Sequence, residues 1–381
     1  MIMKSEMIPF IKKAFFCLSF IVFVLSCEGA GERYPSVDGN VVPMQHSSLL
    51  SVVECDGYTV VDIADPWGDR IMQRYLLVPS AVELPENMPD GILLRTPLDS
   101  VILFSGVHAG LLSELGVAKT VKGVCDAQYM YCDAIESGIA TGTVVNCGSS
   151  LNIDAEAVMQ VSPSAVFVLP YENGGFGKLE SMGFPLVLCA DYMESSPLGC
   201  AEWMRFYGRL FELDSKCDSL FFAVCSGYES LSDTVKTVER RPKLMCELKS
   251  SSAWYVPCGE STMGRMYADA GADYLFSAYK GSGSVPLSYE VVLDKAADAD
   301  VWLFKYNSAE DRTYESLLAD FAGYSHFKPF RQRNIYACNT LRRHIFEETA
   351  FHPERLLKEL VAIIYPELLT DYTLQYYEKL R

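Results

Sequence analysis

The stretch from Pro197 to Glu239 reads PLGCAEWMRFYGRLFELDSKCDSLFFAVCSGYESLSDTVKTVE. Its apolar residues recur at steps of three or four, the spacing of one face of an α-helix. They are Trp203, Phe206, Leu210, Leu213, Cys217, Leu220, Val224, Tyr228, Leu231, Val235 and Val238. Pro197 and Gly199 mark the start, and Arg240, Arg241 and Pro242 mark the end. A continuous helix of this length would run to roughly 60 Å at about 1.5 Å per residue, severalfold longer than an average helix.

Two structures fit this helical run. One is a single core helix in a bundle, and the other is a spine that joins two lobes. Asp214-Ser215 could also cap a second helix and kink the run. Short apolar β-runs alternate with helical runs both before and after the stretch, which favours a spine between two α/β lobes.

The flanking runs predict the content of each lobe. In the first lobe we expect strands at Val101–Phe104, Val121–Val124, Val144–Cys147, Ala165–Leu169 and Pro185–Cys189, and helices at His108–Leu115, Ile153–Val161 and Lys178–Met182. In the second we expect strands at Lys243–Leu248, Val301–Phe304 and Asn334–Cys338, and helices at Thr262–Ala270, Tyr289–Ala296, Tyr314–Phe321 and Pro353–Ile364. Continuous apolar strands are typical of parallel sheets covered on both faces. The predicted fold is α/β, with two Rossmann-like lobes joined by a long backbone helix.

The N-terminal part predicts export and an appended hairpin. Lys12 and Lys13 precede a short apolar run, Ala14 to Leu25, too short to span a bilayer of roughly 30 Å. Cys27 directly after Leu-Ser resembles the bacterial lipobox, in which that cysteine is lipidated; the alternative is a plain signal peptide with an incidental cysteine. Two β-like runs, Gly57–Ile63 and Met72–Val78, flank a turn and predict a β-hairpin extension.

These signals predict five segments. They are a lipoprotein signal peptide (1–26), a flexible tether (27–50), an N-terminal α/β lobe with the hairpin (51–196), the backbone helix (197–239) and a C-terminal α/β lobe (240–381).

Composition narrows the class of protein. Half of the 381 residues are hydrophobic and 21% are charged, which indicates a folded chain. The net charge of −17 argues against nucleic acid as a partner, because binding phosphates needs a surplus of Lys and Arg. Thirteen cysteines occur without any Cys-x-x-Cys spacing. We expect most to be buried free thiols, although Cys125 and Cys132 could pair across a loop.

The motifs of several enzyme classes are missing. The sequence has no phosphate-binding loop, no Gly-x-Ser-x-Gly and no His-Glu-x-x-His, and its five histidines form no close pair. We therefore expect no catalytic residues, no cofactor and no metal site. Two alternatives stay open, a lipoprotein hydrolase on an α/β scaffold and a free-metal carrier that uses His108 with distant ligands.

Polar and aromatic residues follow many of the predicted strands, at the sheet edge where α/β proteins bind ligands. The candidates are His108, Tyr129, Tyr131, Tyr171, Glu172, Trp254, Tyr255, Tyr279, Lys280, Arg342 and Arg343. Two such edges facing each other would form a cleft lined by rings and a few cations, suited to a large, flat or anionic organic ligand. Each aromatic residue could instead simply cap the edge of the core.

The two halves of the chain also share a short repeat. Glu156 and Glu290 begin helices that are followed by similar apolar strands, with an offset of 134 residues, from 156 to 290. A carboxylate in the first turn of a helix offsets the helix dipole by about 0.3–1 kcal/mol, which explains both acids without any function.

Several short motifs occur along the chain: Asp56-Gly57-Tyr58-Thr59-Val60, Asp65-Pro66-Trp67, Gly106-Val107-His108, Gly123-Val124, Glu156 with Ser162-Pro163, DYMESSPLGCAEW from Asp191 to Trp203, Pro286 to Glu290, and Tyr365-Pro366-Glu367-Leu368. Through these residues the chain resembles the helical-backbone class of ABC-transporter substrate-binding proteins, and most closely the branch found in Bacteroides-type bacteria. The stretch ending at Trp203 is the most specific of these motifs.

The resemblance implies a function. Members of this class bind ferric siderophores, haem or cobalamin and deliver them to an inner-membrane permease, to which each lobe presents one glutamate. The matching positions are Glu156 and Glu290. We therefore expect a monomeric periplasmic binding protein, anchored to a membrane through a lipid on Cys27, and not an enzyme.

Overall fold

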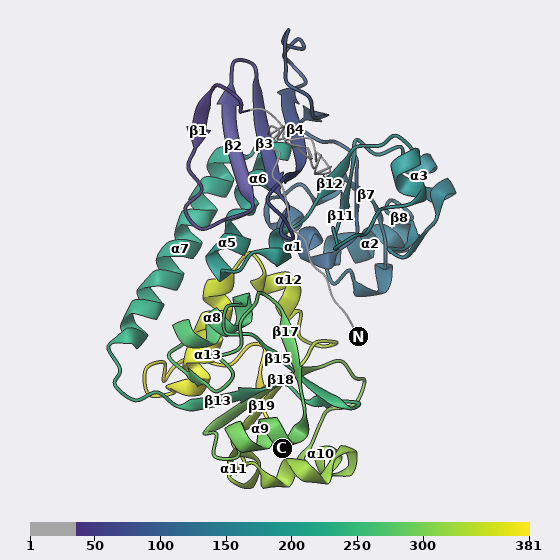
Figure 1. Cartoon of the computed structure of the whole chain (residues 1–381). Helices are drawn as coiled ribbons and strands as arrows, with labels where there is room; N and C mark the ends of the chain where they lie inside the picture. Colours follow the sequence, from purple (N-terminus) through teal and green to yellow (C-terminus); the bar gives the residue numbers. More distant parts are fainter. Residues whose placement is uncertain (1–35) are drawn as a thin grey trace, which may run out of the picture. The chain divides into compact units, whose positions relative to one another are not determined.

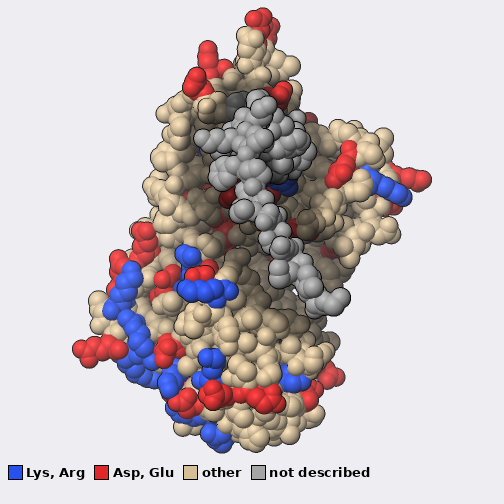
Figure 2. Space-filling view, viewed as in Figure 1, with Lys and Arg blue, Asp and Glu red and all other residues tan. Residues whose placement is uncertain are grey.

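The computed structural model describes residues 36–381 and shows two α/β lobes with a helical spine (Figure 1). The predicted signal peptide and Cys27 lie outside the described residues. Within residues 36–381, no helix is both long enough and apolar enough to cross a bilayer. On the face shown in Figure 2, acidic and basic side chains lie mainly along the outer margin of the second lobe.

The predicted hairpin is confirmed as the centre of a larger sheet. The strands β3 (Tyr58–Ala64) and β4 (Ile71–Pro79) pair antiparallel. They belong to a five-stranded sheet of order β1-β2-β3-β4-β5, completed by β1 (Asn40–Val42), β2 (Leu50–Cys55) and β5 (Ile92–Thr96).

The predicted flexible tether is wrong for its described part. Besides the pairing of β1 with β2, backbone N–H groups of residues 45–47 donate to the carboxylate of Glu202, at 2.8 to 2.9 Å. Those of Ser48 and Leu49 donate to Glu194, at 2.9 and 3.1 Å. Glycine, serine and proline suggested a mobile chain, but two carboxylates on distant elements satisfy its backbone donors and hold it in place.

The first lobe contains a parallel sheet of order β12-β11-β6-β7-β8. Its strands are β6 (Val101–Leu103), β7 (Val121–Val124), β8 (Val145–Asn146), β11 (Ala165–Val168) and β12 (Leu186–Leu188). Its helices are α1 (Gly106–Glu114), α2 (Asp133–Thr141), α3 (Ala155–Val161) and α4 (Lys178–Ser181). Short elements include β9 (Gly148–Ser149), β10 (Asn152–Ile153), and the 3-10 turns η1 (Ala118–Thr120), η2 (Ala127–Tyr129) and η3 (Asp191–Met193). All five strands were predicted; α2 was missed.

The second lobe is built on a sheet of order β16-β13-β18-β19-β20, parallel except for the last strand. Its strands are β13 (Lys243–Cys246), β16 (Asp273–Tyr274), β18 (Val301–Tyr306), β19 (Ile335–Asn339) and β20 (Glu378–Lys379). A separate three-stranded sheet contains β14 (Lys249–Ser250), β15 (Ala253–Pro257) and β17 (Ser284–Leu287). The helical elements are α8 (Thr262–Asp269), α9 (Tyr289–Ala296), α10 (Tyr314–Asp320), η4 (Ala322–His326), α11 (Lys328–Arg331), α12 (Ile345–Thr349) and α13 (Pro353–Ile364).

The spine is not one continuous helix. It consists of α5 (Pro197–Glu202), α6 (Met204–Leu210) and α7 (Asp214–Lys236), so the alternative of a break at Asp214 is correct. Asp214-Ser215 does not cap the second helix, because the N-cap is Leu213 and no side chain of the described residues caps α7. Glu212 takes a left-handed conformation at the break, with φ of 56°. After it, α7 folds back so closely on α6 that a Cβ on Gly208 would lie 2.4 Å from Cys217 Sγ. Farther along, α7 packs against α13 of the second lobe.

Candidate ligand-binding groove

Three neighbouring cavities share lining residues, and we call them together the groove. The first cavity, about 420 Å³, is lined by Phe104, Ser150–Ile153, Leu169, Tyr171 and Gly175–Leu179. The second, about 300 Å³, is lined by Ser105, Val107, His108, Leu169, Pro170, Tyr171, Asp191 and Tyr192. The third, about 260 Å³, is lined by Val107, Asp191, Tyr192, Pro197, Cys200, Thr262, Met263, Met266, Lys305, Ile345, Phe346, Thr349, Ala350, Pro353, Leu356 and Tyr377. The groove thus reaches from the first lobe, past the spine, to the second.

The topology of the first sheet explains where the groove begins. The strand order reverses between β6 and β11, so the connections after these two strands leave in opposite directions. Residues Phe104 and Ser105 follow β6, and Leu169 to Tyr171 follow β11, and all of these residues line the groove. This is the position at which open α/β sheets bind ligands.

The groove has exposed apolar and aromatic walls. Tyr171 and Tyr192 are 55% and 51% exposed, Phe346 is 52% exposed, and Leu151 is 94% exposed. The hydroxyl of Tyr171 donates to the carbonyl of Gly175 at 2.9 Å, and that of Tyr192 donates to the carbonyl of Pro170. Because the hydroxyls are already bonded to the backbone, the rings are held in place and their faces remain free to pack against a ligand.

A buried polar cluster lies beneath the second cavity. His108 Nε2 and Asp191 Oδ1 are hydrogen bonded at 3.0 Å, and the hydroxyl of Tyr207 donates to the same oxygen at 2.6 Å. Burial lowers the pKa of His108, but the charges of Cys189 and Asp191 outweigh it and raise the pKa to about 10. The cluster therefore joins α1, η3 and the spine at the floor of the groove.

The second lobe contributes an ion pair and a phenol. Lys305, at the end of β18, binds Glu247 at 2.8 Å, just after β13. The strand order of this sheet changes direction between these two strands. The buried Tyr377 also lines the third cavity, and its hydroxyl has no hydrogen-bond partner among residues 36–381. Lys305 and Tyr377 therefore place an ammonium group and a phenol at this end of the groove.

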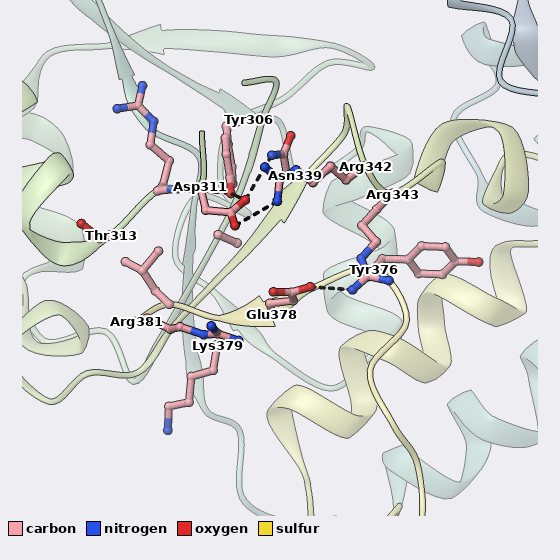
Figure 3. A pocket seen from close by; sticks show the side chains of 13 residues that line it. Tyr306, Asp311, Thr313, Asn339, Arg342, Arg343, Tyr376, Glu378, Lys379 and Arg381 are labelled. Carbon is pink, nitrogen blue, oxygen red and sulfur yellow. Dashed lines mark hydrogen bonds and ion pairs between the residues drawn. The ribbon is translucent and has the colours of Figure 1, made fainter. Parts of the chain in front are cut away.

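A separate cavity of about 520 Å³ lies within the second lobe and is rich in cations (Figure 3). Its lining residues are Tyr306, Asp311, Arg312, Thr313, Ala337, Asn339, Arg342, Arg343, Tyr376, Glu378, Lys379, Leu380 and Arg381. Arg342 binds Asp311 at 3.1 Å, and Arg343 binds Glu378 at 2.5 Å. Basic side chains outnumber acidic ones in this cavity, in a chain whose net charge is −17.

Only two of the predicted cleft candidates line the groove. His108 and Tyr171 line the groove, although His108 is buried and reaches it only as part of the floor. Tyr131 stacks on His344 at 4.7 Å, so it joins the two lobes. Tyr129 and Glu172 are exposed on the loops after β7 and β11. Arg342 and Arg343 line the cation-rich cavity of the second lobe, outside the groove.

The prediction for Trp254 is wrong. Its side chain is fully buried, its indole N–H donates to the carbonyl of Cys246 at 2.9 Å, and its ring packs on Trp302 and Phe327. The reason is that residues 253–257 form β15 of a second sheet, and not the loop after β13. Alternation along β15 leaves the next residue, Tyr255, exposed.

Two further candidates have other contacts. Tyr279 packs under the ammonium group of Lys295, 5.6 Å from the ring centroid. Lys280 binds Glu260 at 2.7 Å in an exposed ion pair. Neither residue lines one of the cavities described above.

The two predicted docking glutamates occupy equivalent places. Glu156 is the second residue of α3 and Glu290 the second residue of α9, and both are exposed. The strands that follow these helices, β11 and β18, each pair with the first strand of their parallel sheet, β6 and β13. The short sequence repeat therefore marks equivalent helix–strand units in the two lobes.

Several groove residues were missed by the sequence reasoning. They are Asp191, Tyr192, Met263, Met266, Lys305, Phe346 and Tyr377. Asp191 and Tyr192 stand in the DYMESSPLGCAEW stretch, whose specificity was noted without a role. Lys305 lies inside an otherwise apolar strand, and a single cation in such a strand is a sequence signal for a functional residue.

Comparison with known proteins agrees with this architecture. Residues 101–340 match the periplasmic binding protein family, and the chain belongs to this family. The match begins at β6, so the five-stranded N-terminal sheet precedes it. An uncharacterized lipoprotein of Methanocaldococcus jannaschii is 25% identical over 317 residues, which cover 78% of this chain and 74% of that protein. A second uncharacterized lipoprotein of the same organism is 22% identical over 362 residues, covering 92% and 89%.

Solved structures share the fold at low identity. The chain is similar to an ABC-type Fe3+-hydroxamate transport protein from Saccharomonospora viridis, with 16% identity, a TM-score of 0.56, and coverage of 73% of this chain and 96% of that one. A periplasmic heme-binding protein from Pseudomonas aeruginosa has 14% identity and a TM-score of 0.55, with coverage of 71% and 93%. The fold is that of helical-backbone substrate-binding proteins of ABC transporters. The Bacteroides-type branch stays a prediction.

Proposed function

We propose that this protein captures a ferric siderophore, haem or cobalamin and delivers it to an ABC permease of the inner membrane. The observation that carries the proposal is the groove, which starts at the switch point of the first sheet and has exposed rings on its walls. Flat or macrocyclic ligands bury most area against such walls, and ring contacts contribute about 0.5–1.5 kcal/mol beyond area burial.

One ammonium group and one phenol near the groove suit an anionic ligand. Lys305 and the phenol of Tyr377 lie at the inner end of the groove. Carboxylates of a tetrapyrrole or of a siderophore would find hydrogen-bond donors there, and a phenol without a partner favours an oxygen acceptor. These contacts support the proposed ligand class and leave the choice among its members to experiment.

The two lobes are held together by more than the spine. Helix α1 packs against α12, and His352 binds Glu114 across the lobes at 2.7 Å. Such contacts restrict hinge motion, so ligand binding in the groove would change the outer surface only slightly. A permease would then recognise a largely preformed docking surface.

For that docking surface we propose Glu156 and Glu290. Each is exposed in the first turn of a helix, and the two helices occupy equivalent places in the lobes. Carboxylates so placed could each pair with a cation of a two-fold permease and fix the register of the complex.

Uptake in cells tests this assignment. Glu156→Lys and Glu290→Lys should leave folding and ligand affinity unchanged and should reduce uptake, more in the double variant, because charge reversal adds repulsion to the lost pairing. The exposed Glu315, in the first turn of α10, provides a matched control as Glu315→Lys. Full uptake by a correctly exported double variant would remove the docking role.

The lipid anchor is part of the same proposal. Both Methanocaldococcus relatives are named lipoproteins, which supports a periplasmic protein lipidated on Cys27. Mass spectrometry of the mature N-terminus tests it: a diacylated Cys27 is expected, and a mature chain that begins elsewhere would contradict the anchor.

A further inference from the structure

The polar cluster under the second cavity contains three potential metal ligands. One donor atom each of His108, Cys189 and Asp191 lies within 4.8 Å of the other two, and all three residues are buried. They come from α1, from the residue after β12, and from η3. The folding of the first lobe thus gathers an imidazole, a thiol and a carboxylate at one point.

We propose that His108, Cys189 and Asp191 bind a divalent transition-metal ion of the Zn2+ type. Imidazole and thiolate together favour Zn2+ over the oxygen-preferring Mg2+ and Ca2+. Three protein ligands leave a fourth tetrahedral position open. Because His108 and Asp191 line the second cavity, that position opens into the groove, where water or a donor atom of a bound ligand can occupy it.

Tyr207 acts as a positioning residue for this site. Its hydroxyl donates to Asp191 Oδ1 at 2.6 Å, and its ring packs on His108 with the centroids 5.1 Å apart. Hydrogen bonds to ligating carboxylates fix their orientation, and loss of such a partner typically lowers metal affinity about 10- to 100-fold.

The alternative for this cluster is a hydrogen-bonded network that only fastens α1 and η3 to the spine. The thiol separates the two interpretations, because Cys189 is not needed for the bonds among His108, Asp191 and Tyr207. The metal site also stands apart from the proposed function, since a zinc titration without any chelate or tetrapyrrole tests it.

The test is a titration of chelator-treated protein with Zn2+ and, in parallel, with Co2+. The wild type should bind one equivalent, with a thiolate-to-cobalt absorption band and a thermal stabilisation by Zn2+. Cys189→Ser and Asp191→Asn should abolish both signals, and Tyr207→Phe should weaken binding about 10- to 100-fold. Cys246→Ser is the matched control, because Cys246 is also a buried thiol at the end of a strand, in the second lobe.

Circular dichroism without metal checks that each variant folds. A folded wild type that binds no Zn2+ would overturn the proposal, as would unchanged binding in folded Cys189→Ser. Loss of binding in Cys200→Ser alone would also overturn it, by placing the metal at the groove thiol instead.

Discussion

Both lobes contain a mainly parallel sheet, but they differ in what covers the aromatic residues that follow its strands. In the first lobe, the short turn η2 follows β7 and a loop follows β11, and Tyr129 and Tyr171 remain exposed. In the second, the chain after β13 forms the additional sheet β14-β15-β17, which buries Trp254. An aromatic residue that follows a strand is therefore free to contact a ligand only where no further element covers it.

The neighbours Trp254 and Tyr255 give the largest expected contrast. Trp254→Ala should lower the free energy of unfolding by about 3–5 kcal/mol, because it leaves a cavity among Trp302, Tyr324 and Phe327. Tyr255→Ala should change it by about 0.5 kcal/mol or less, since the ring is exposed. Urea unfolding of both variants measures the difference, and equal effects would contradict the register of β15.

Both lobes use a buried glutamate to fasten a distant segment. Glu202 accepts three backbone N–H bonds from residues 45–47, and Glu359 accepts three from residues 375–377. Glu202→Gln and Glu359→Gln should each cost about 2–3 kcal/mol, because an amide NH2 would face backbone donors. Denaturation measures the cost. If one variant alone kept the free energy of unfolding of the wild type, only the other lobe would depend on its buried glutamate.

A smaller and pH-dependent effect is expected at the contact between the lobes. Burial lowers the pKa of His352, but hydrogen bonds to Glu114 and Glu354 outweigh it and raise the pKa above 6.5. The hydrogen bond from His352 lowers the pKa of Glu114 below 4.5. The pair therefore stabilises the folded state fully between pH 4.5 and pH 6.5, the ordinary pKa values of glutamate and histidine. This stabilisation is lost as the pH rises through the folded pKa of His352.

His352→Gln tests this sign. The variant should be less stable than the wild type by about 1–2 kcal/mol near pH 6, and the gap should shrink in alkaline solution. Thermal unfolding at several pH values measures the gap. A gap that grows with pH would mean that His352 is neutral in the folded protein.

Much of the fold could be predicted because apolar periodicity is a local signal. Every strand of the parallel sheet in the first lobe was found, and α13 has the predicted bounds, Pro353–Ile364. What was missed has weak local patterns: β14 and β20 are two residues long, and α2 contains a glycine and a threonine and ends directly before Gly142. The break of the spine at Asp214 was an open alternative in the sequence, but the close approach of Gly208 to Cys217 beside it is a tertiary contact that periodicity does not show.

The site was less predictable than the fold for a related reason. Tyr171 and His108 could be predicted because they follow strands, and the carboxyl ends of parallel strands meet at one edge of the sheet. Lys305 and Tyr377 come together only through packing between β18 and the C-terminal segment. The roles of Glu194 and Glu202, in the most specific stretch of the sequence, became visible only with residues 45–49 in place.

The central claim is that the groove binds an iron chelate or a tetrapyrrole through exposed rings. Its most direct test is a calorimetric titration of the wild type with haem, cobalamin and ferric siderophores, repeated with the double variant Tyr171→Ala/Tyr192→Ala and with Tyr255→Ala as the control. We predict that at least one ligand class binds more tightly than about 100 μM, that is about −5.5 kcal/mol, and that only the groove variant loses at least about tenfold in affinity. Binding of none of these ligands, or equal losses in both variants, would contradict the account.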